Sequence, residues 1–221
     1  MMAEKKQTLI LASASPRRQE YLALLDIPYI CQAAEVDETL EPCQTPARFA
    51  MELAERKAKA VAAQHPGCYV LGADTIVVNG NRILGKPKDD RDAFAMLQGL
   101  QGKKHEVITG LCVVAPDKTV HRDFRSTTVQ MAQMTEKEIR AYVATGEPRD
   151  KAGAYAIQGK GAAMIERIEG CYFKWWGCQS TEQSSCCKRP GILMKPEKTG
   201  SYEKKNLSGF FFVEGSFSER G

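Results

Sequence analysis

The sequence has little that would place it among exported, membrane-spanning or nucleic-acid-binding proteins. None of its 221 residues falls in an apolar run approaching the roughly 18 residues that a membrane helix needs. The first residues, Met1 to Lys6, are polar and lack the apolar core of a signal peptide, so a cytoplasmic protein is expected. The net charge is only +4, and no stripe of alternating aromatic and basic residues is present. Neither a membrane nor a nucleic acid is therefore expected as a partner.

Several familiar catalytic and metal-binding patterns are also missing. The three histidines are isolated, and the chain has no G-x-S-x-G nucleophile motif, no C-x-x-C pair and no internal repeat. Without an export signal, the 8 cysteines are expected to be reduced thiols rather than a disulfide framework. Four of them gather near the C-terminus, but without the paired spacing of a zinc site: Cys171, Cys178, Cys186 and Cys187.

What is present is an ordinary globular composition, 43% hydrophobic and 26% charged. The length suits one sizeable α/β domain or two small lobes. Apolar periodicity and turn residues predict strands over residues 9–11, 27–30, 68–78, 82–84, 106–115, 119–130 and 162–169. The same signals predict helices that begin at 16, at about 47 and at 89, and a fourth after the capping box formed by Thr135 and Glu138.

The stretch from Ser13 to Arg18 joins the first predicted strand to the first predicted helix. Ser15-Pro16 is typical of a helix N-cap followed by proline at the first helical position. Arg17 and Arg18 then place two cations in a first helical turn, where they oppose the helix dipole. A bound phosphate would remove this conflict, because helix N–H groups and guanidinium groups both favour anions. The alternative is a solvated arginine pair beside a core strand.

Asp74 is the second informative residue. It lies inside an apolar run of strand-forming residues, where an unpaired carboxylate would be costly. It either caps a strand end or serves as a base or metal ligand. The acidic loop that contains Glu38 has a similar pair of interpretations, a solvated charge run or a role in holding metal or water.

Two further segments raise the question of ligand binding. Residues 80–86 spell G-x-x-x-x-G-K, but Pro87 stands where a P-loop needs Ser or Thr, so a P-loop is rejected. Lys86 can still reach a phosphate as a point charge. Residues 150–161 mix glycines with residues that can hold a polar ligand, which indicates either a binding loop or a turn-rich connection.

Taken together, the motifs resemble one known family. They are Ser13-x-Ser15-Pro16-Arg17-Arg18-Gln19-Glu20, Gly72-Ala73-Asp74-Thr75, Leu84-Gly85-Lys86-Pro87, Thr109-Gly110 and Gly146-Glu147-Pro148-x-Asp150-Lys151-Ala152-Gly153-x-Tyr155-x-Ile157-Gln158-Gly159. In this order and at these separations they are similar to the Maf family of nucleoside triphosphate pyrophosphatases, also described as septum-formation inhibitors. The resemblance covers about Leu9 to Tyr172.

The resemblance implies a cytoplasmic hydrolase of nucleotide metabolism that cuts a nucleoside triphosphate to the monophosphate and pyrophosphate. It also implies an α/β fold of the Maf and ITPase type, with a mixed, twisted central sheet flanked by helices, two lobes with a cleft between them, and commonly a homodimer. Within the family the chain is similar to the branch acting on dTTP and UTP, whose specificity residues fall on Arg17, Thr75 and Gln158. The alternative is a non-catalytic, nucleotide-binding regulator of cell division.

The resemblance also assigns roles to individual residues. The family's proton acceptor falls on Asp74, and its supporting polar residues fall on Ser13, Arg18, Glu38, Lys57 and Lys86. Of these, Ser13, Arg18, Lys57 and Lys86 are the expected phosphate-binding residues, with Arg17 completing the clamp on the triphosphate. Glu38 and Asp74 are the expected ligands of a divalent cation, Mg²⁺ or Mn²⁺. Thr75 and Gln158 can both donate and accept hydrogen bonds, as reading a pyrimidine edge requires.

The C-terminal part departs from the family pattern after Tyr172. The family continues there with a segment like Asn-Val-Val-Gly-Leu-Pro and a final helix, whereas this chain continues Phe173-Lys174-Trp175-Trp176. No clear period follows to Gly221. We therefore expect a Maf-like domain over residues 1–172 and an atypical tail over 173–221, either disordered or altered in its reading frame.

Overall fold

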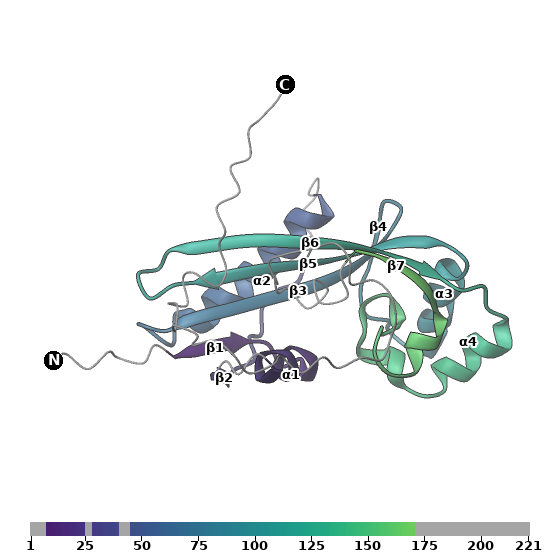
Figure 1. Cartoon of the computed structure of the whole chain (residues 1–221), viewed down its shortest axis with the longest axis horizontal. Helices are drawn as coiled ribbons and strands as arrows, with labels where there is room; N and C mark the ends of the chain where they lie inside the picture. Colours follow the sequence, from purple (N-terminus) through teal and green to yellow (C-terminus); the bar gives the residue numbers. More distant parts are fainter. Residues whose placement is uncertain (1–7, 25–27, 40–44, 171–221) are drawn as a thin grey trace, which may run out of the picture. The chain divides into compact units, whose positions relative to one another are not determined.

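Three long antiparallel strands form the centre of the sheet in the computed structural model, which describes residues 8–24, 28–39 and 45–170. They are β3 (Tyr69–Asn79), β5 (Lys104–Val114) and β6 (Val120–Met131). Four shorter strands complete it, namely β1 (Leu9–Ala12), β2 (Tyr29–Cys31), β4 (Arg82–Leu84) and β7 (Ile165–Glu169). The order is β2-β1-β3-β5-β6-β7, with β4 paired to β3 (Figure 1). Because β1 runs parallel to both β2 and β3, the sheet is mixed, as predicted.

The described residues form four α-helices beside this sheet, and their starts follow the predicted signals. They are α1 (Pro16–Leu24), α2 (Pro46–Ala62), α3 (Asp90–Leu100) and α4 (Glu136–Val143). The Thr45 and Asp89 side chains cap α2 and α3, and Thr135 and Glu138 form the expected capping box at α4. None of the helices in the described ranges is long and apolar enough to cross a membrane.

Strand boundaries differ from the prediction at several places, and the start of the last strand differs most. The last strand was expected to begin at Ala162, but residues Gly159–Met164 form a 3-10 segment, η3, and β7 begins at Ile165. The physical reason is a contact with a distant residue, because the backbone N–H of Gly161 donates to the Glu147 carboxylate, fourteen residues earlier in the chain. Two more 3-10 segments precede it, η1 (Glu147–Asp150) and η2 (Ala152–Ala154).

Side-chain alternation along β3 assigns the helices to opposite faces of the sheet. Val70, Ile76 and Val78 point to the face covered by α2, which packs on β3 and β5. Leu71 and Val77 point to the other face. On that second face Leu71 packs with Leu22 of α1, and Val77 packs with residues of α3 and α4. The second face therefore carries two separate groups of helices, with Thr75 between their two contact points along the strand.

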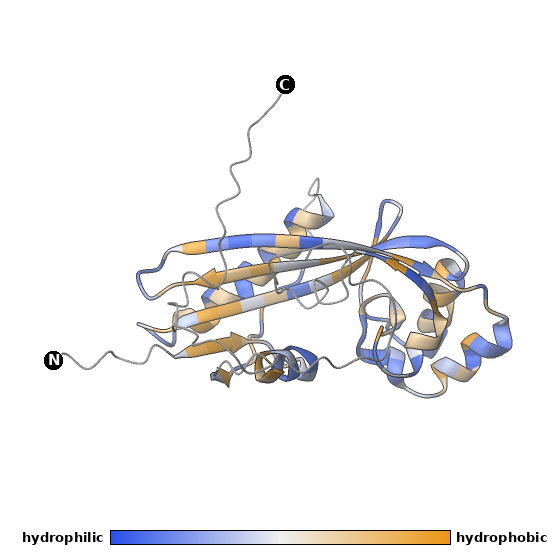
Figure 2. Ribbon diagram, in the orientation of Figure 1, coloured by the Kyte–Doolittle hydropathy of each residue, from blue (hydrophilic) through white to orange (hydrophobic). Residues whose placement is uncertain are grey.

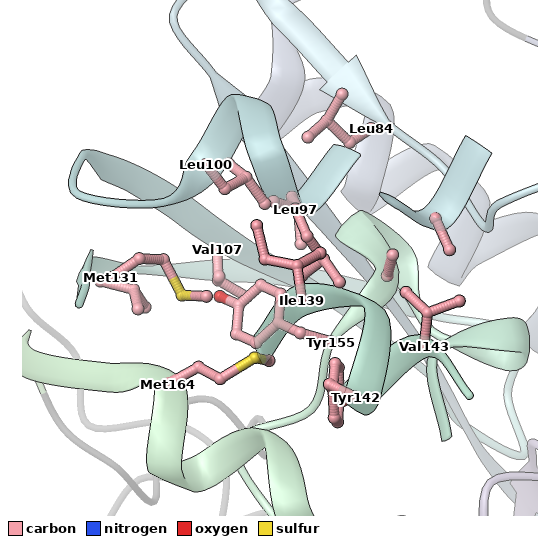
Figure 3. Packing of buried hydrophobic residues seen from close by; sticks show 14 residues of the cluster. Leu84, Leu97, Leu100, Val107, Met131, Ile139, Tyr142, Val143, Tyr155 and Met164 are labelled. Carbon is pink, nitrogen blue, oxygen red and sulfur yellow. The ribbon is translucent and has the colours of Figure 1, made fainter. Parts of the chain in front are cut away.

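The largest buried cluster belongs to the second group. Leu97 and Leu100 of α3 and Ile139 and Val143 of α4 enclose Tyr155, together with residues of the central strands (Figure 3). Strands β1 and β3 are largely hydrophobic, whereas β6 carries many hydrophilic residues (Figure 2), consistent with its alternating exposure. The two lobes and the cleft between them, which the family resemblance implies, stay predictions.

The predicted tail over 173–221 and the group of four cysteines that begins at Cys171 lie outside the described residues. The same holds for the predicted domain boundary at Tyr172.

Candidate active site

The candidate site lies along one edge of β3, at a gap in the sheet. Among the described strands, β1 pairs with this edge only as far as Gly72, and β4 pairs with it only from Val77 onward. The opposite edge is paired to β5 throughout residues 70–78. Asp74 and Thr75 lie within the gap, and the chain leaving β1 runs past it as the Ser13–Ser15 loop. Ends of parallel strands are where α/β proteins commonly bind ligands.

Two glycines let helix α2 approach the sheet closely. A Cβ atom on Gly72 would come within 2.2 Å of the Ala54 carbonyl oxygen, and one on Gly110 within 2.3 Å of the Ala50 backbone. Gly110 pairs directly with Asp74 in the β3–β5 register, so it leaves space beside that carboxylate on the α2 face. The close packing of α2 over β3 brings Lys57 to Asp74.

Lys57 holds two carboxylates together. Its Nζ lies 2.5 Å from Oδ1 of Asp74 and 2.8 Å from Oε1 of Glu38. The Lys57 and Asp74 side chains are only 15% and 13% exposed, so little solvent screens their charges. Burial raises the pKa of Asp74, and the charges of Lys57 and Arg18 offset that effect in part. The hydrogen bond from Lys57 lowers the pKa of Glu38.

Arg18 connects the loop after β1 to the gap in the sheet. Its guanidinium donates to Ser13 Oγ at 2.9 Å and to Thr75 Oγ1 at 3.2 Å. Thr75 is hydrogen-bonded in turn to Thr109 on the neighbouring strand, at 3.0 Å between the two hydroxyl oxygens. Burial lowers the pKa of Arg18, while the charge of Asp74 raises it. The structure therefore brings four predicted residues together: Ser13, Arg18, Asp74 and Thr75.

Arg17 belongs to a different part of the site. Its charge lowers the pKa of Glu147 and of Asp150, although burial and hydrogen bonds are the larger influences on both carboxyl groups. These acids belong to the segment that leads to Gln158. The Gln158 side chain is half-buried and makes no hydrogen bond to any described residue. The two adjacent arginines thus differ in their surroundings: Arg18 hydrogen-bonds Ser13 and Thr75, whereas the charge of Arg17 acts on Glu147 and Asp150.

Lys86 is exposed and makes no ion pair with a described residue, but its charge contributes to lowering the pKa of Glu38. The backbone just before Lys86 is held in place, because the carbonyl of Gly85 accepts a hydrogen bond of 3.0 Å from the backbone N–H of Gly153. A Cβ on Gly153 would come within 2.9 Å of Val77, so this segment packs directly on β3. Lys86 therefore lies on the side of the site that Glu38 faces.

The donor set at Glu38 and Asp74 fits a hard divalent cation. Both carboxylates converge on the Lys57 ammonium, which shows that they can share one positive charge. Carboxylate oxygens suit Mg²⁺ and Mn²⁺, and Mg²⁺ is commonly bound by one or two carboxylates with substrate phosphates completing the shell. No group of three or more histidine, cysteine, aspartate or glutamate side chains arranged for a metal occurs in the described part of the chain.

Comparison with known proteins decides the family. Residues 8–185 match the Maf family, described as Maf-like protein. The chain belongs to the Maf family. It is 51% identical over 164 residues to a protein of Bacillus cytotoxicus named dTTP/UTP pyrophosphatase, covering 74% of this chain and 85% of that protein. A Bacillus cereus protein of the same name is 48% identical over 170 residues, covering 77% of this chain and 83% of its own length.

Solved structures give a more distant similarity. The Staphylococcus aureus Ham1 protein superposes with a TM-score of 0.42 at 15% identity, over 57% of this chain and 72% of that one. A nucleoside-triphosphatase, or dITP/XTP pyrophosphatase, from Mycobacterium abscessus gives a TM-score of 0.40 at 14% identity, over 58% and 76% of the two chains.

Two residues of this Maf protein escaped the sequence-based assignment of roles. Thr109 is fully buried and hydrogen-bonds Thr75, and Glu147 accepts hydrogen bonds from the backbone that follows Gln158. Both occur in motifs that carried the family resemblance, in Thr109-Gly110 and Gly146-Glu147-Pro148. Their contacts depend on pairing between distant segments, which spacing along the chain does not reveal.

Proposed function

We propose that this chain hydrolyses dTTP and UTP to the corresponding monophosphate and pyrophosphate. The observation that supports the proposal best is the Lys57–Asp74–Arg18 arrangement at the gap beside β3. It combines a poorly solvated carboxylate, a lysine that pairs with it directly, and an arginine whose charge also acts on it. A base and a set of phosphate-binding charges are what pyrophosphate release from a nucleotide requires. The names of the Bacillus relatives give the substrates.

Asp74 would serve as the proton acceptor. Water attacks the α-phosphorus, a new P–O bond forms, and the bond from the α-phosphorus to the oxygen bridging to the β-phosphate breaks. The water proton passes to the Asp74 carboxylate, and pyrophosphate leaves with the electron pair of the broken bond. Because burial raises the pKa of Asp74, this carboxylate is a better base than one in water. Lys57 keeps it oriented and ionised before the reaction.

The cations of the site would hold the triphosphate. Arg18 is fixed by Ser13 and Thr75, so its guanidinium is already oriented before a ligand arrives. Lys86 is exposed and unpaired within the described residues, so it can meet the negative charge that develops on the departing pyrophosphate. Mg²⁺ or Mn²⁺ held by Glu38 and Asp74 would neutralise phosphate charge and polarise the phosphoryl group.

Base recognition would fall to the residues on the other side of the gap. Thr75 lies on the face of β3 that carries α1, and Gln158 offers an amide with no described partner. Arg17 acts on the segment that leads to Gln158. These three residues match the specificity positions of the dTTP/UTP branch of the family. A cytoplasmic location and a homodimer complete the proposal, both from the family resemblance.

The test is pyrophosphate release by the purified full chain from dTTP and UTP, with Mn²⁺ and with EDTA. We expect activity that depends on the divalent ion. The Asp74→Asn variant should lose about 10²–10⁴-fold in kcat, because it lacks a general base. The control is Asp90→Asn, which removes only an exposed ion pair with Arg149 and should retain full activity.

Two outcomes would count against the proposal. An Asp74→Asn variant as active as the parent would show that Asp74 is not the base. Binding of dTTP without any turnover by the parent would instead favour a nucleotide-binding regulator.

A further inference from the structure

Glu147 is a half-buried carboxylate on which three hydrogen-bond donors converge. It accepts from the Tyr142 hydroxyl at 2.9 Å and from the backbone N–H groups of Lys160 and Gly161, both at 3.0 Å. Burial raises its pKa, but the two backbone hydrogen bonds, Tyr142 and the charge of Arg17 outweigh burial and lower it overall. Glu147 is therefore an ionised side chain that joins the end of α4 to the loop after Gln158.

Two glycines let this loop lie close to Glu147 and its neighbours. Gly159 has φ of +79°, and a Cβ atom there would come within 2.7 Å of Oε2 of Glu147. A Cβ on Gly161 would come within 2.4 Å of the Ala156 carbonyl oxygen and 2.7 Å of the Tyr142 hydroxyl. Gln158 comes just before these glycines. The backbone that follows it is therefore held at two successive amides, those of Lys160 and Gly161.

Gln158 itself has no such restraint on its side chain. Its amide makes no hydrogen bond to any described residue, although the side chain is half-buried. A half-buried amide directed by a fixed backbone is suited to hydrogen-bonding a ligand, since the polar group is already partly desolvated. The charge of Arg17 also contributes to lowering the pKa of Glu147.

We propose that Glu147 is a positioning residue that fixes Gln158 by holding the amides of Lys160 and Gly161, and that it thereby sets the preference for pyrimidine over purine nucleotides. The inference rests on the proposed function for its second half, because selectivity requires that the chain act on nucleotides. Its first half, the fixing of the loop, is independent of turnover. Glu147 acts through Gln158, without touching the reacting phosphorus.

The experiment compares the full chain with its Glu147→Gln variant in two measurements. The first is amide hydrogen exchange, resolved to single residues by NMR. In the variant, the amides of Lys160 and Gly161 should exchange at least about tenfold faster, because hydrogen bonds to a carboxylate are worth more than those to a neutral amide. The second is kcat/KM for dTTP and for dATP. The dTTP value should fall about tenfold, mainly through KM, while the dATP value changes less than twofold.

The matched control is Glu136→Gln, which removes an exposed carboxylate of α4 paired with Arg140 at 3.5 Å. It should leave both the exchange rates and the dTTP to dATP ratio unchanged. Should Glu147→Gln not fold, Tyr142→Phe keeps the carboxylate, removes one of its three donors and should shift the ratio in the same direction by a smaller factor.

The outcomes separate the two proposals. Unchanged exchange at Lys160 and Gly161 would overturn the positioning role. Faster exchange with equal losses for dTTP and dATP would show that Glu147 is structural only and would overturn its role in selectivity. A parent chain that releases no pyrophosphate from either nucleotide would refute the proposed function and the selectivity role with it, whereas the exchange rates would still decide the positioning role.

Discussion

Gly110 offers a direct test of how the fold positions the reaction chemistry. The Gly110→Ala variant places a Cβ atom 2.3 Å from the backbone carbonyl of Ala50 and 2.5 Å from the nitrogen of Met51. Carbon atoms in ordinary contact lie about 3.5–4.0 Å apart, so helix α2 must move by about 1 Å or more. Backbone atoms of a buried helix cannot rotate away as a side chain can.

The displacement should change the contacts of Lys57, which lies on α2. Its contacts of 2.5 Å with Asp74 and 2.8 Å with Glu38 would lengthen together. Overpacking of this kind costs about 1–3 kcal/mol of unfolding free energy. For a domain of this size that corresponds to a decrease in Tm of about 2–12 °C. Misplacing a catalytic group by about 1 Å can cost on the order of 10²-fold in rate.

The assay is dTTP pyrophosphate release at 25 °C, below the Tm of the variant, together with thermal unfolding. Gly99→Ala is the matched control, because it adds the same methyl group inside α3 with no atom within 4 Å. That variant should gain about 0.5–1 kcal/mol in stability and keep its activity. If Gly110→Ala retained both the Tm and the kcat/KM of the parent, the argument that close packing of α2 positions Lys57 would be wrong.

Two further predictions concern buried titratable side chains. The Lys57→Met variant removes a charge that lowers the pKa of Asp74, so that pKa should rise further. The acidic limb of the kcat/KM profile should then move to higher pH. An unmoved limb would contradict the pairing of Lys57 with Asp74. Burial lowers the pKa of His105 from 6.5 to about 4. As the pH falls below about 6.5, the unfolded chain takes up a proton on this histidine and the folded chain does not. The free energy of unfolding therefore falls by about 3 kcal/mol as the pH approaches 4. Urea unfolding between pH 7 and pH 4.5 should show this loss in the parent and a smaller one in His105→Gln; equal losses in both would exclude His105 as the cause.

Local signals were enough to locate most elements of this Maf protein. The capping residues Thr45, Asp89 and Thr135 mark their helices because capping depends on residues only three positions apart. The strands predicted over 68–78 and 82–84 are confirmed as the antiparallel pair β3 and β4, because the turn between them, at Asn79-Gly80, is also a local signal. The start of β7 was misjudged, since the backbone N–H of Gly161 donates its hydrogen bond to Glu147, fourteen residues earlier, and Gly161 stays in a 3-10 segment.

The sequence by itself determined which residue types were available: an arginine pair after a capped turn, and an aspartate that an apolar strand could not leave unpaired. Only the tertiary structure decided their partners. It paired Lys57 with Asp74 and Arg18 with Thr75, and it joined Thr109 to Thr75 and Glu147 to the loop after Gln158. The physical reason is that capping and turn formation act over a few residues, whereas these contacts require a parallel strand pairing that stops at Gly72 and a helix resting on two glycines.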